Sequence, residues 1–138
     1  MVGDAALKLP MAVWDDRTAR DFSAIRSASH RDLEILELQV DQGEALLHAV
    51  EVGGVRVGSM IWSIETETDG KRALIVQAIG CDAVPGRDLL SEVHAAVEVL
   101  AKFSKCWAIR CWTERPGMVR KLGRVGFRSR YVLEKEIA

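Results

Sequence analysis

The sequence predicts a single α/β domain built on a mixed, mostly antiparallel sheet with a central parallel strand pair flanked by helices. The parallel pair follows from the second half of the chain. There the apolar, β-branched run Ala73–Cys81 leads into a helical repeat and then into a short strand, Trp107–Thr113. The antiparallel part follows from Glu44–Val52 and Val55–Glu65, two strand-like stretches joined by a pair of glycines, which is a strong hairpin signal.

Length and composition fit one globular domain over residues 1–138. Of the 138 residues, 49% are hydrophobic and 28% charged, so the chain is large enough to bury a core and too apolar to be disordered. No apolar run approaches the ~20 residues of a membrane helix, and residues 1–10 lack the pattern of a secretory signal. The net charge of −1 gives no general attraction to nucleic acid or membrane. We expect a cytoplasmic protein.

The cysteines and histidines show neither a disulfide pattern nor a metal-ligand pattern. If Cys106 and Cys111 share one strand, they point to opposite faces and cannot bridge each other. The three histidines have no ligand spacing with the cysteines. We therefore expect free thiols in a reducing compartment and no metal site.

The first third of the chain predicts one edge strand and two helices. Met11–Trp14 is the expected strand, and Ala19–Ser27 is the expected first helix. The candidate caps of that helix are Asp15, Asp16 and Thr18. Apolar residues between positions 33 and 38 indicate a second helical piece, and Gln42-Gly43 marks the turn that follows it.

The second half begins at the turn Asp69-Gly70 and then alternates strands and helices. Asp88 is the expected N-cap of the helix that follows the strand Ala73–Cys81. The apolar face of this helix should be buried against the sheet, and its members are Leu90, Val93, Val97 and Leu100.

A short helix and a last strand are expected to close the domain. Pro116 suits the first position of the helix, and Gly126 ends it with a residue free to take positive φ. Arg128–Ile137 is the expected final strand. On the preceding strand Trp112 shares a face with Arg110, so these two side chains can form a cation–π stack.

This order of elements, closed by the sequence KLGRVGFRSRYVLEKEI with its Gly126-Phe127 pair, resembles the C-terminal half of the GNAT superfamily. Members of that superfamily are acetyl-CoA-dependent N-acyltransferases. The resemblance covers roughly the last half of the chain directly, and the N-terminal half fits the same fold by its order of elements.

The resemblance implies an acetyl-CoA site where the strand Ala73–Cys81 meets the next helix. Free N–H groups at a helix N-terminus favour phosphate, and family members usually carry an Arg/Gln-x-x-Gly-x-Gly/Ala loop there. The matching loop in this chain reads CDAVPG. The cofactor-binding residues that follow from the match are Cys81, Ala83, Gly86 and Arg87.

The loop departs from the family pattern in ways that weaken phosphate binding. Only Gly86 matches, whereas Val84 stands at the position of the first glycine and blocks a close approach of the backbone. Pro85 lacks an N–H donor, and Asp82 and Asp88 bring negative charge to an anion site. A plain capped helix is the competing interpretation of this segment.

The catalytic residues of the family are replaced. Alignment on Gly126-Phe127 puts Leu122 where the family's acidic Tyr stands. Tyr131, the only tyrosine, is the candidate acid if the last strand curls back, and otherwise a packing residue. Glu65, with Glu67 beside it, is the candidate general base, and both are otherwise solvated turn residues.

Two functions remain open at this point. The resemblance implies an acyltransferase that acts on an amine-bearing small molecule or protein. The eroded loop suggests the alternative, a non-catalytic GNAT-fold interaction protein such as a component of a bacteriophage particle. In that case we expect a protein partner or a homo-oligomer, and the virion becomes a second candidate location.

Overall fold

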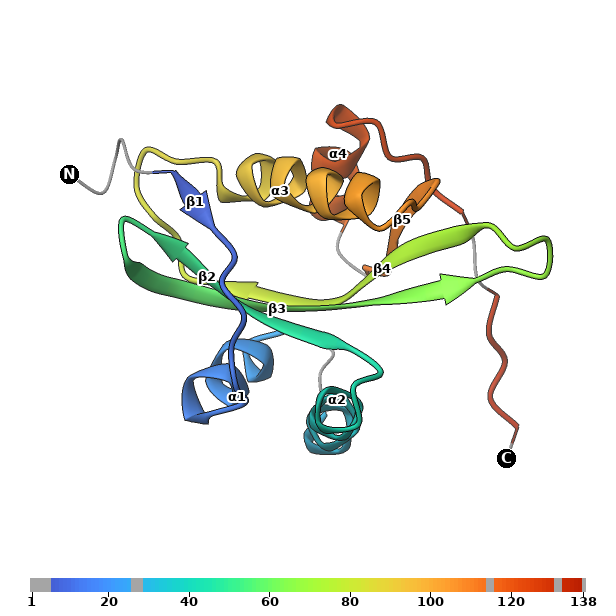
Figure 1. Cartoon of the computed structure of the whole chain (residues 1–138), viewed down its shortest axis with the longest axis horizontal. Coiled ribbons are helices and arrows are strands. Elements are labelled where there is room, and N and C mark those ends of the chain that lie inside the picture. The colour runs from blue at the N-terminus through green and yellow to red at the C-terminus, as the bar shows by residue number, and fades with distance from the viewer. Residues whose placement is uncertain (1–5, 26–28, 114–115, 131–132, 138) are drawn as a thin grey trace.

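The computed structural model describes residues 6–25, 29–113, 116–130 and 133–137. They form three layers, with a five-stranded sheet between one pair of helices on each face (Figure 1). The strands are β1 Leu7–Lys8, β2 Leu46–Val52, β3 Val55–Thr66, β4 Arg72–Cys81 and β5 Ala108–Cys111. The helices are α1 Asp16–Ser23 and α2 His30–Asp41 on one face, and α3 Leu89–Phe103 and α4 Pro116–Arg124 on the other.

The sheet is mixed, as the sequence predicts. Its order is β1-β2-β3-β4-β5, and every neighbouring pair is antiparallel except β4 and β5, which run parallel with Ala73 opposite Ala108. The predicted parallel pairing of Ala73–Cys81 with Trp107–Thr113 is therefore confirmed, and α3 connects the two strands. The pair lies at one edge of the described sheet rather than at its centre, because β5 is the last strand in the order.

The predicted final strand over Arg128–Ile137 is wrong for the residues that the structure describes. Residues 128–130 and 133–137 have no regular secondary structure, and Leu133 and Ile137 are 93% and 84% exposed. Alternation of apolar and polar residues makes a segment suitable for a strand, but a strand forms only where a neighbouring edge accepts its hydrogen bonds.

The predicted first strand is displaced toward the N-terminus. Leu7 and Lys8 pair with the end of β2, whereas Met11–Trp14 contributes only an isolated bridge from Met11 to His48. The chain stays beside β2 between these points, since the Pro10 carbonyl accepts from the Ala49 N–H at 2.9 Å. Pro10 has no N–H to donate, so the edge strand is interrupted there.

Local caps fix the first two helices. Asp15 accepts a hydrogen bond from the Thr18 N–H at 2.9 Å, and the Thr18 hydroxyl closes a capping box with the Asp15 backbone. Helix α1 therefore begins at Asp16, earlier than predicted, and ends at Ser23. Ser29 and Asp32 form the equivalent box at the start of α2.

Two apolar clusters lie on opposite faces of the sheet. Under α3 the buried cluster includes Val50, Met60, Trp62, Leu74, Val93, Val97 and Ala101. Under α1 and α2 it includes Phe22, Ala45, Leu47, Ile61 and Ala78. The predicted burial of Val93 and Val97 is confirmed, while Leu90 and Leu100 are half-buried.

Candidate active site at the end of the parallel strand pair

Strand β4 carries an extra residue at the point where its pairing with the parallel strand β5 ends. Opposite β3, Ala78 pairs with Ile61 and Val76 with Trp62, so Gln77 is left over as a bulge. Pairing with β5 ends at the same point, where Val76 lies opposite Cys111. A bulge bends its strand, and residues 77–81 continue without a described strand partner on that side. We call this region the β4–β5 opening.

Gln77 is held in place by its side chain. Its amide nitrogen donates to the Ser63 hydroxyl at 2.8 Å, across to β3. The bond ties the bulged residue to β3 at the position where the pairing of β4 with β5 ends. The amide is not basic, so Gln77 positions the strand and cannot act as a general base.

Helix α3 begins close to the carboxyl end of β4. Gly86 makes the preceding turn with φ of +78°, and Asp88 caps the helix by accepting from the Ser91 N–H at 3.3 Å and the Ser91 hydroxyl at 2.8 Å. The bonds from the Ser91 side chain and backbone lower the pKa of Asp88, and the charge of Lys121 on α4 contributes. Asp88 stays ionised and uses an N–H group that a phosphate would otherwise bind.

The carboxylate of Asp82 is ion-paired with two arginines of helix α1. The sequence did not indicate this contact. Arg17 donates to its carboxylate at 3.0 Å, and Arg20 donates to both carboxylate oxygens at 3.0 Å. The Asp82 N–H also donates to the Val57 carbonyl at 2.7 Å. The side chain is therefore engaged with α1, and its charge does not stand unpaired at the start of the loop.

The ion pairs continue into the interior between α1 and the sheet. Asp21 is 4% exposed and accepts from Arg17 Nε at 2.9 Å and from the Ser59 hydroxyl at 2.6 Å. Arg56 in turn donates to the Ser59 oxygen at 2.8 Å. Helix α1 lies directly on β4, because a Cβ atom at Gly80 would come within 2.2 Å of the Asp21 carbonyl oxygen.

The first predicted cofactor residue, Cys81, is exposed at the end of β4, but its sulfur packs against the backbone and the pKa of its thiol is raised. Its sulfur lies over Gly58, where an added Cβ would come within 2.6 Å of it. Desolvation, followed by the nearby carboxylates of Asp21 and Asp82, raises the pKa of Cys81 to about 11. The thiol is therefore protonated near neutral pH and unsuited to act as a nucleophile.

The other three predicted cofactor residues lie in two different settings. Ala83 and Gly86 are exposed on the loop. The Arg87 side chain is only 8% exposed and binds Glu92 on the first turn of α3, with Nε 3.0 Å from Oε2 and a second bond from Nη2 to Oε1. Arg87 can meet a phosphate only if it leaves or shares this partner.

The structure does not bring the predicted base to the loop. Glu65 is opposite Ala73, near the amino end of β4. Measured along β4 from Ala73 at about 3.3 Å per residue, Glu65 is about 10 Å from Val76 and about 26 Å from Cys81. Its neighbour Glu67 accepts an ion-pair hydrogen bond from Arg110 at 2.5 Å. The other predicted catalytic residue, Tyr131, lies outside the described residues.

The expected stack of Arg110 on Trp112 is wrong. The Arg110 guanidinium lies over Trp107, 5.6 Å from the ring centroid, and Lys71 lies 5.3 Å from the same ring. Strand β5 ends at Cys111, so Trp112 no longer follows the alternation that placed it beside Arg110. Its ring is 66% exposed.

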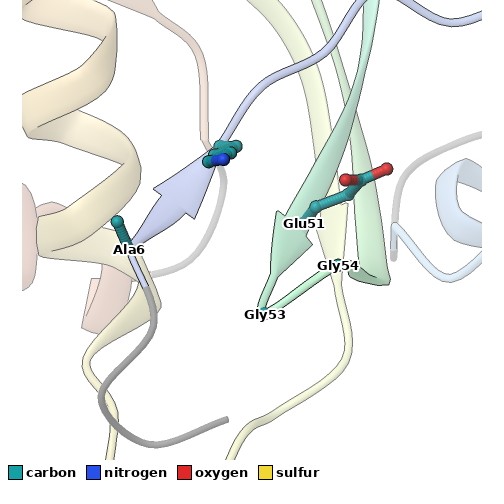
Figure 2. A pocket seen from close by; sticks show the side chains of 5 residues that line it. Ala6, Glu51, Gly53 and Gly54 are labelled. Carbon is teal, nitrogen blue, oxygen red and sulfur yellow. The ribbon is translucent and has the colours of Figure 1, made fainter.

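A shallow pocket lies at the opposite edge of the sheet. It has a volume of about 410 Å³ and is lined by Ala6, Lys8, Glu51, Gly53 and Gly54, from β1 and the β2–β3 hairpin (Figure 2). Because it stands apart from the parallel strand pair, it does not belong to the β4–β5 opening. Within the described residues no His, Cys, Asp or Glu cluster could hold a metal ion, and no helix has the length and apolarity to cross a bilayer.

The order of elements, with a bulge where the parallel pairing ends beside a helix N-terminus, agrees with the GNAT fold. The chain is similar over nearly its whole length to solved acetyltransferase structures. A putative acetyltransferase from Pyrococcus furiosus matches with a TM-score of 0.76 and 15% identity, over 98% of this chain and 100% of that one. A ribosomal-protein-alanine N-acetyltransferase from Brucella melitensis matches with 0.70 and 17%, over 96% and 99%.

An aminoglycoside acetyltransferase from an uncultured soil sample, solved with sisomicin, matches with a TM-score of 0.69 and 12% identity, over 96% of this chain and 95% of that one. No protein-family model matches the sequence, and no curated protein matches it significantly. The chain thus has the GNAT fold, while its sequence is only 12–17% identical to these neighbours.

Proposed function

We propose that this protein is an acyl-CoA-dependent N-acyltransferase. The observation that carries the proposal is the bulge at Gln77, which coincides with the end of β5 pairing at Val76 on the strand that leads into α3. Similarity to acetyltransferase structures over nearly the whole chain supports it.

The chain offers a partial fit to acetyl-CoA. On the side of β4 that faces away from β3, residues 77–81 have no described strand partner. The first turn of α3 presents backbone N–H groups. Ala83 and Gly86 are exposed beside it. Other residues oppose phosphate binding. Val84 blocks a close approach of the loop backbone, Pro85 lacks an N–H donor, and Asp88 already caps the helix. We therefore expect weak binding that combines the strand edge with the charge of Arg87.

The proposed reaction needs little from side chains. Bound acetyl-CoA would supply an acyl group activated as a thioester. Backbone N–H groups of the loop beyond Asp82, whose own N–H is bonded to the Val57 carbonyl, would polarise the thioester carbonyl. A primary amine would attack that carbon directly, so no covalent enzyme intermediate is needed. Because Glu65 lies about 26 Å along the strand from Cys81, the amine is proposed to lose its proton to solvent water rather than to Glu65. Tyr131 is proposed to protonate the leaving thiolate.

The proposed acceptor is an amine on a small molecule or a protein. Two of the similar structures are named for such acceptors, an aminoglycoside and the alanine of a ribosomal protein. We propose that the protein acts in the cytoplasm.

A non-catalytic role is the second candidate, and the loop favours it. Arg87 is bound to Glu92 and Asp88 is bound to Ser91, so both side chains have structural partners. With the loop eroded in this way, the domain could serve as an interaction module, for example within a bacteriophage particle. Its partner would then be a protein, and the virion its location.

Titration calorimetry with acetyl-CoA, paired with an assay for thiol release on a panel of primary amines, distinguishes the two roles. We expect a dissociation constant on the order of 0.1 mM, or about −5.5 kcal/mol, and amine-dependent thiol release. Arg87→Ala should abolish the binding, and Glu92→Gln is the matched control that breaks the same pair but keeps the cation. A folded protein that gives no heat at millimolar ligand would favour the interaction module.

A further inference from the structure

Helix α2 carries an exposed apolar pair with acidic residues beside it. None of its twelve residues is buried. Ile35 and Leu38, which are three residues apart and therefore share one face, are 45% and 54% exposed. Glu34 and Asp41 flank Leu38, four residues before it and three after it, and both are exposed. We call these four residues the acidic α2 surface.

The surroundings of the acidic α2 surface are acidic as well. Residues 30–44 contain five Asp and Glu residues and one arginine, Arg31. Glu34 has His30 as its neighbour at 3.2 Å, whereas Asp41 has no ion-pair partner among the described residues. In a single chain the apolar pair therefore faces water within a region of negative charge.

Helix α3 carries a second exposed apolar pair, with cations beside it. Val99 and Phe103 are four residues apart on the face that points away from the buried Val97, and they are 67% and 88% exposed. Lys102 lies beside Phe103 in the last turn, Lys105 follows the helix, and both are exposed. We call Val99, Lys102, Phe103 and Lys105 the basic α3 surface.

The positive charge of the basic α3 surface is not cancelled locally. The two acids of α3 have partners of their own, since Glu92 binds Arg87 and Glu98 lies 3.2 Å from His94. Neither lysine of the surface has an ion-pair partner among the described residues. Between positions 99 and 130 the described residues include eight Lys and Arg and no Asp or Glu. This surface is therefore positive where α2 is negative.

One copy of the chain cannot bring the two surfaces together. Helix α2 covers one face of the sheet and α3 the other, so the sheet lies between them (Figure 1). Two copies can do so. At about 1.5 Å per residue α2 is about 18 Å long and α3 about 22 Å, and each helix presents an apolar pair with the spacing at which helices pack on one another.

We propose that the acidic α2 surface of one copy docks on the basic α3 surface of a second copy. With the two helices aligned in parallel, the two apolar pairs pack on each other. Asp41 then lies beside Lys105, because each follows its apolar pair toward the end of its helix. The contact joins two different surfaces, so repeated docking produces a ring or an open chain of copies. It is independent of the acyltransferase activity proposed above.

Sedimentation velocity of the full chain between 1 and about 200 µM, a range suited to micromolar association, tests the proposal. We expect oligomers that grow past the dimer as the concentration rises. Leu38→Asp and, separately, Phe103→Asp should each weaken association at least tenfold, because each puts a charge into the apolar contact. Val55→Asp is the matched control. Val55 is as exposed as Leu38, at 54%, but lies at the start of β3, so the change should leave association as it was.

Charge reversal separates this contact from other kinds of association. Glu34→Lys with Asp41→Lys makes both surfaces positive, and Lys102→Glu with Lys105→Glu makes both negative. Each double variant alone should be monomeric over the same range, with its fold retained because all four side chains are exposed. An equimolar mixture should associate again, since every α2 surface then meets an α3 surface of opposite charge on the other variant.

A parent chain that stays monomeric up to about 200 µM overturns the proposal. So does association that stops at a dimer, because a two-fold contact joins like surfaces. Oligomers that survive either charge reversal, or a mixture of the two reversed variants that remains monomeric, would likewise show that these two surfaces do not bind each other.

Discussion

Arg20 on α1 donates hydrogen bonds to both carboxylate oxygens of Asp82, at 3.0 Å each, although 62 residues separate them. The contact joins the first helix to the start of the loop that leads into α3. Asp82 at a phosphate loop looks unfavourable from sequence alone, yet its charge is directed to α1 and paired. Binding of an acyl-CoA at the β4–β5 opening would therefore depend on where α1 holds this loop.

We expect Asp82→Asn to loosen the loop more than it destabilises the fold. Asp82 and Arg20 are 54% and 60% exposed, so solvent screening limits their contribution to about 0.5–1 kcal/mol. Urea unfolding should show this small loss, while hydrogen exchange at the amides of residues 83–87 should accelerate. The control is Asp41→Asn, which changes an exposed carboxylate at the end of α2. Unchanged exchange in the loop would contradict the role assigned to Asp82.

Gly80→Ala should separate α1 from β4. The new Cβ would lie 2.2 Å from the Asp21 carbonyl oxygen, and because that atom is backbone, the helix must shift. We expect a loss of about 3 kcal/mol in the free energy of unfolding. The matched change Gly123→Ala on α4 meets no atom within 4 Å and should stabilise by about 0.5–1 kcal/mol. Equal effects at the two glycines would rule out the close contact.

Cys81 should react slowly with iodoacetamide. Its pKa of about 11, against 9.0 for an unperturbed thiol, predicts alkylation at pH 8 about 100-fold slower than in the unfolded chain. Peptide mass spectrometry can follow this cysteine separately from Cys106 and Cys111. Alkylation of Cys81 at the rate of the unfolded chain would show that the thiol is not desolvated.

The same thiol contributes to the pH dependence of stability. Because the folded state holds the proton more tightly, the contribution is complete below pH 9, and it is lost as the pH rises from about 9 toward about 11. Cys81→Ser removes this titration, so the variant should lose less stability than the parent over that window. Chemical unfolding at pH 8, 9.5 and 11 checks the difference, and parallel curves would contradict it.

Val97→Asp should unfold or severely destabilise the domain. Val97 is 3% exposed under α3, so the substitution buries an unpaired charge, with an expected cost of about 4 kcal/mol or more. The melting temperature should fall by roughly 10 °C or more. Ala95→Asp, on the exposed side of the same helix, is the control and should change it little. A small effect at Val97 would mean that the other face of α3 is buried.

The sequence by itself determined the structural elements that depend on residues close to one another in the chain. The two glycines after β2 have φ of 60° and 78°, which few other residues adopt without strain, so the hairpin was predictable from two positions. Asp88 caps α3 through a neighbour three residues away. The apolar repeat of α3 fixed its buried face, and the strand–helix–strand order fixed the parallel direction of β4 and β5.

The tertiary structure alone decided the features that depend on distant partners. The bulge at Gln77 appears only when β4 is registered against β3, since one extra residue leaves the apolar pattern of the strand intact. The pairing of Asp82 with Arg17 spans 65 residues, and no short pattern marks it. The predicted last strand failed for the same reason. Its alternation was present in the sequence, but a strand exists only where an edge binds it, and edges belong to the folded chain or to its assembly.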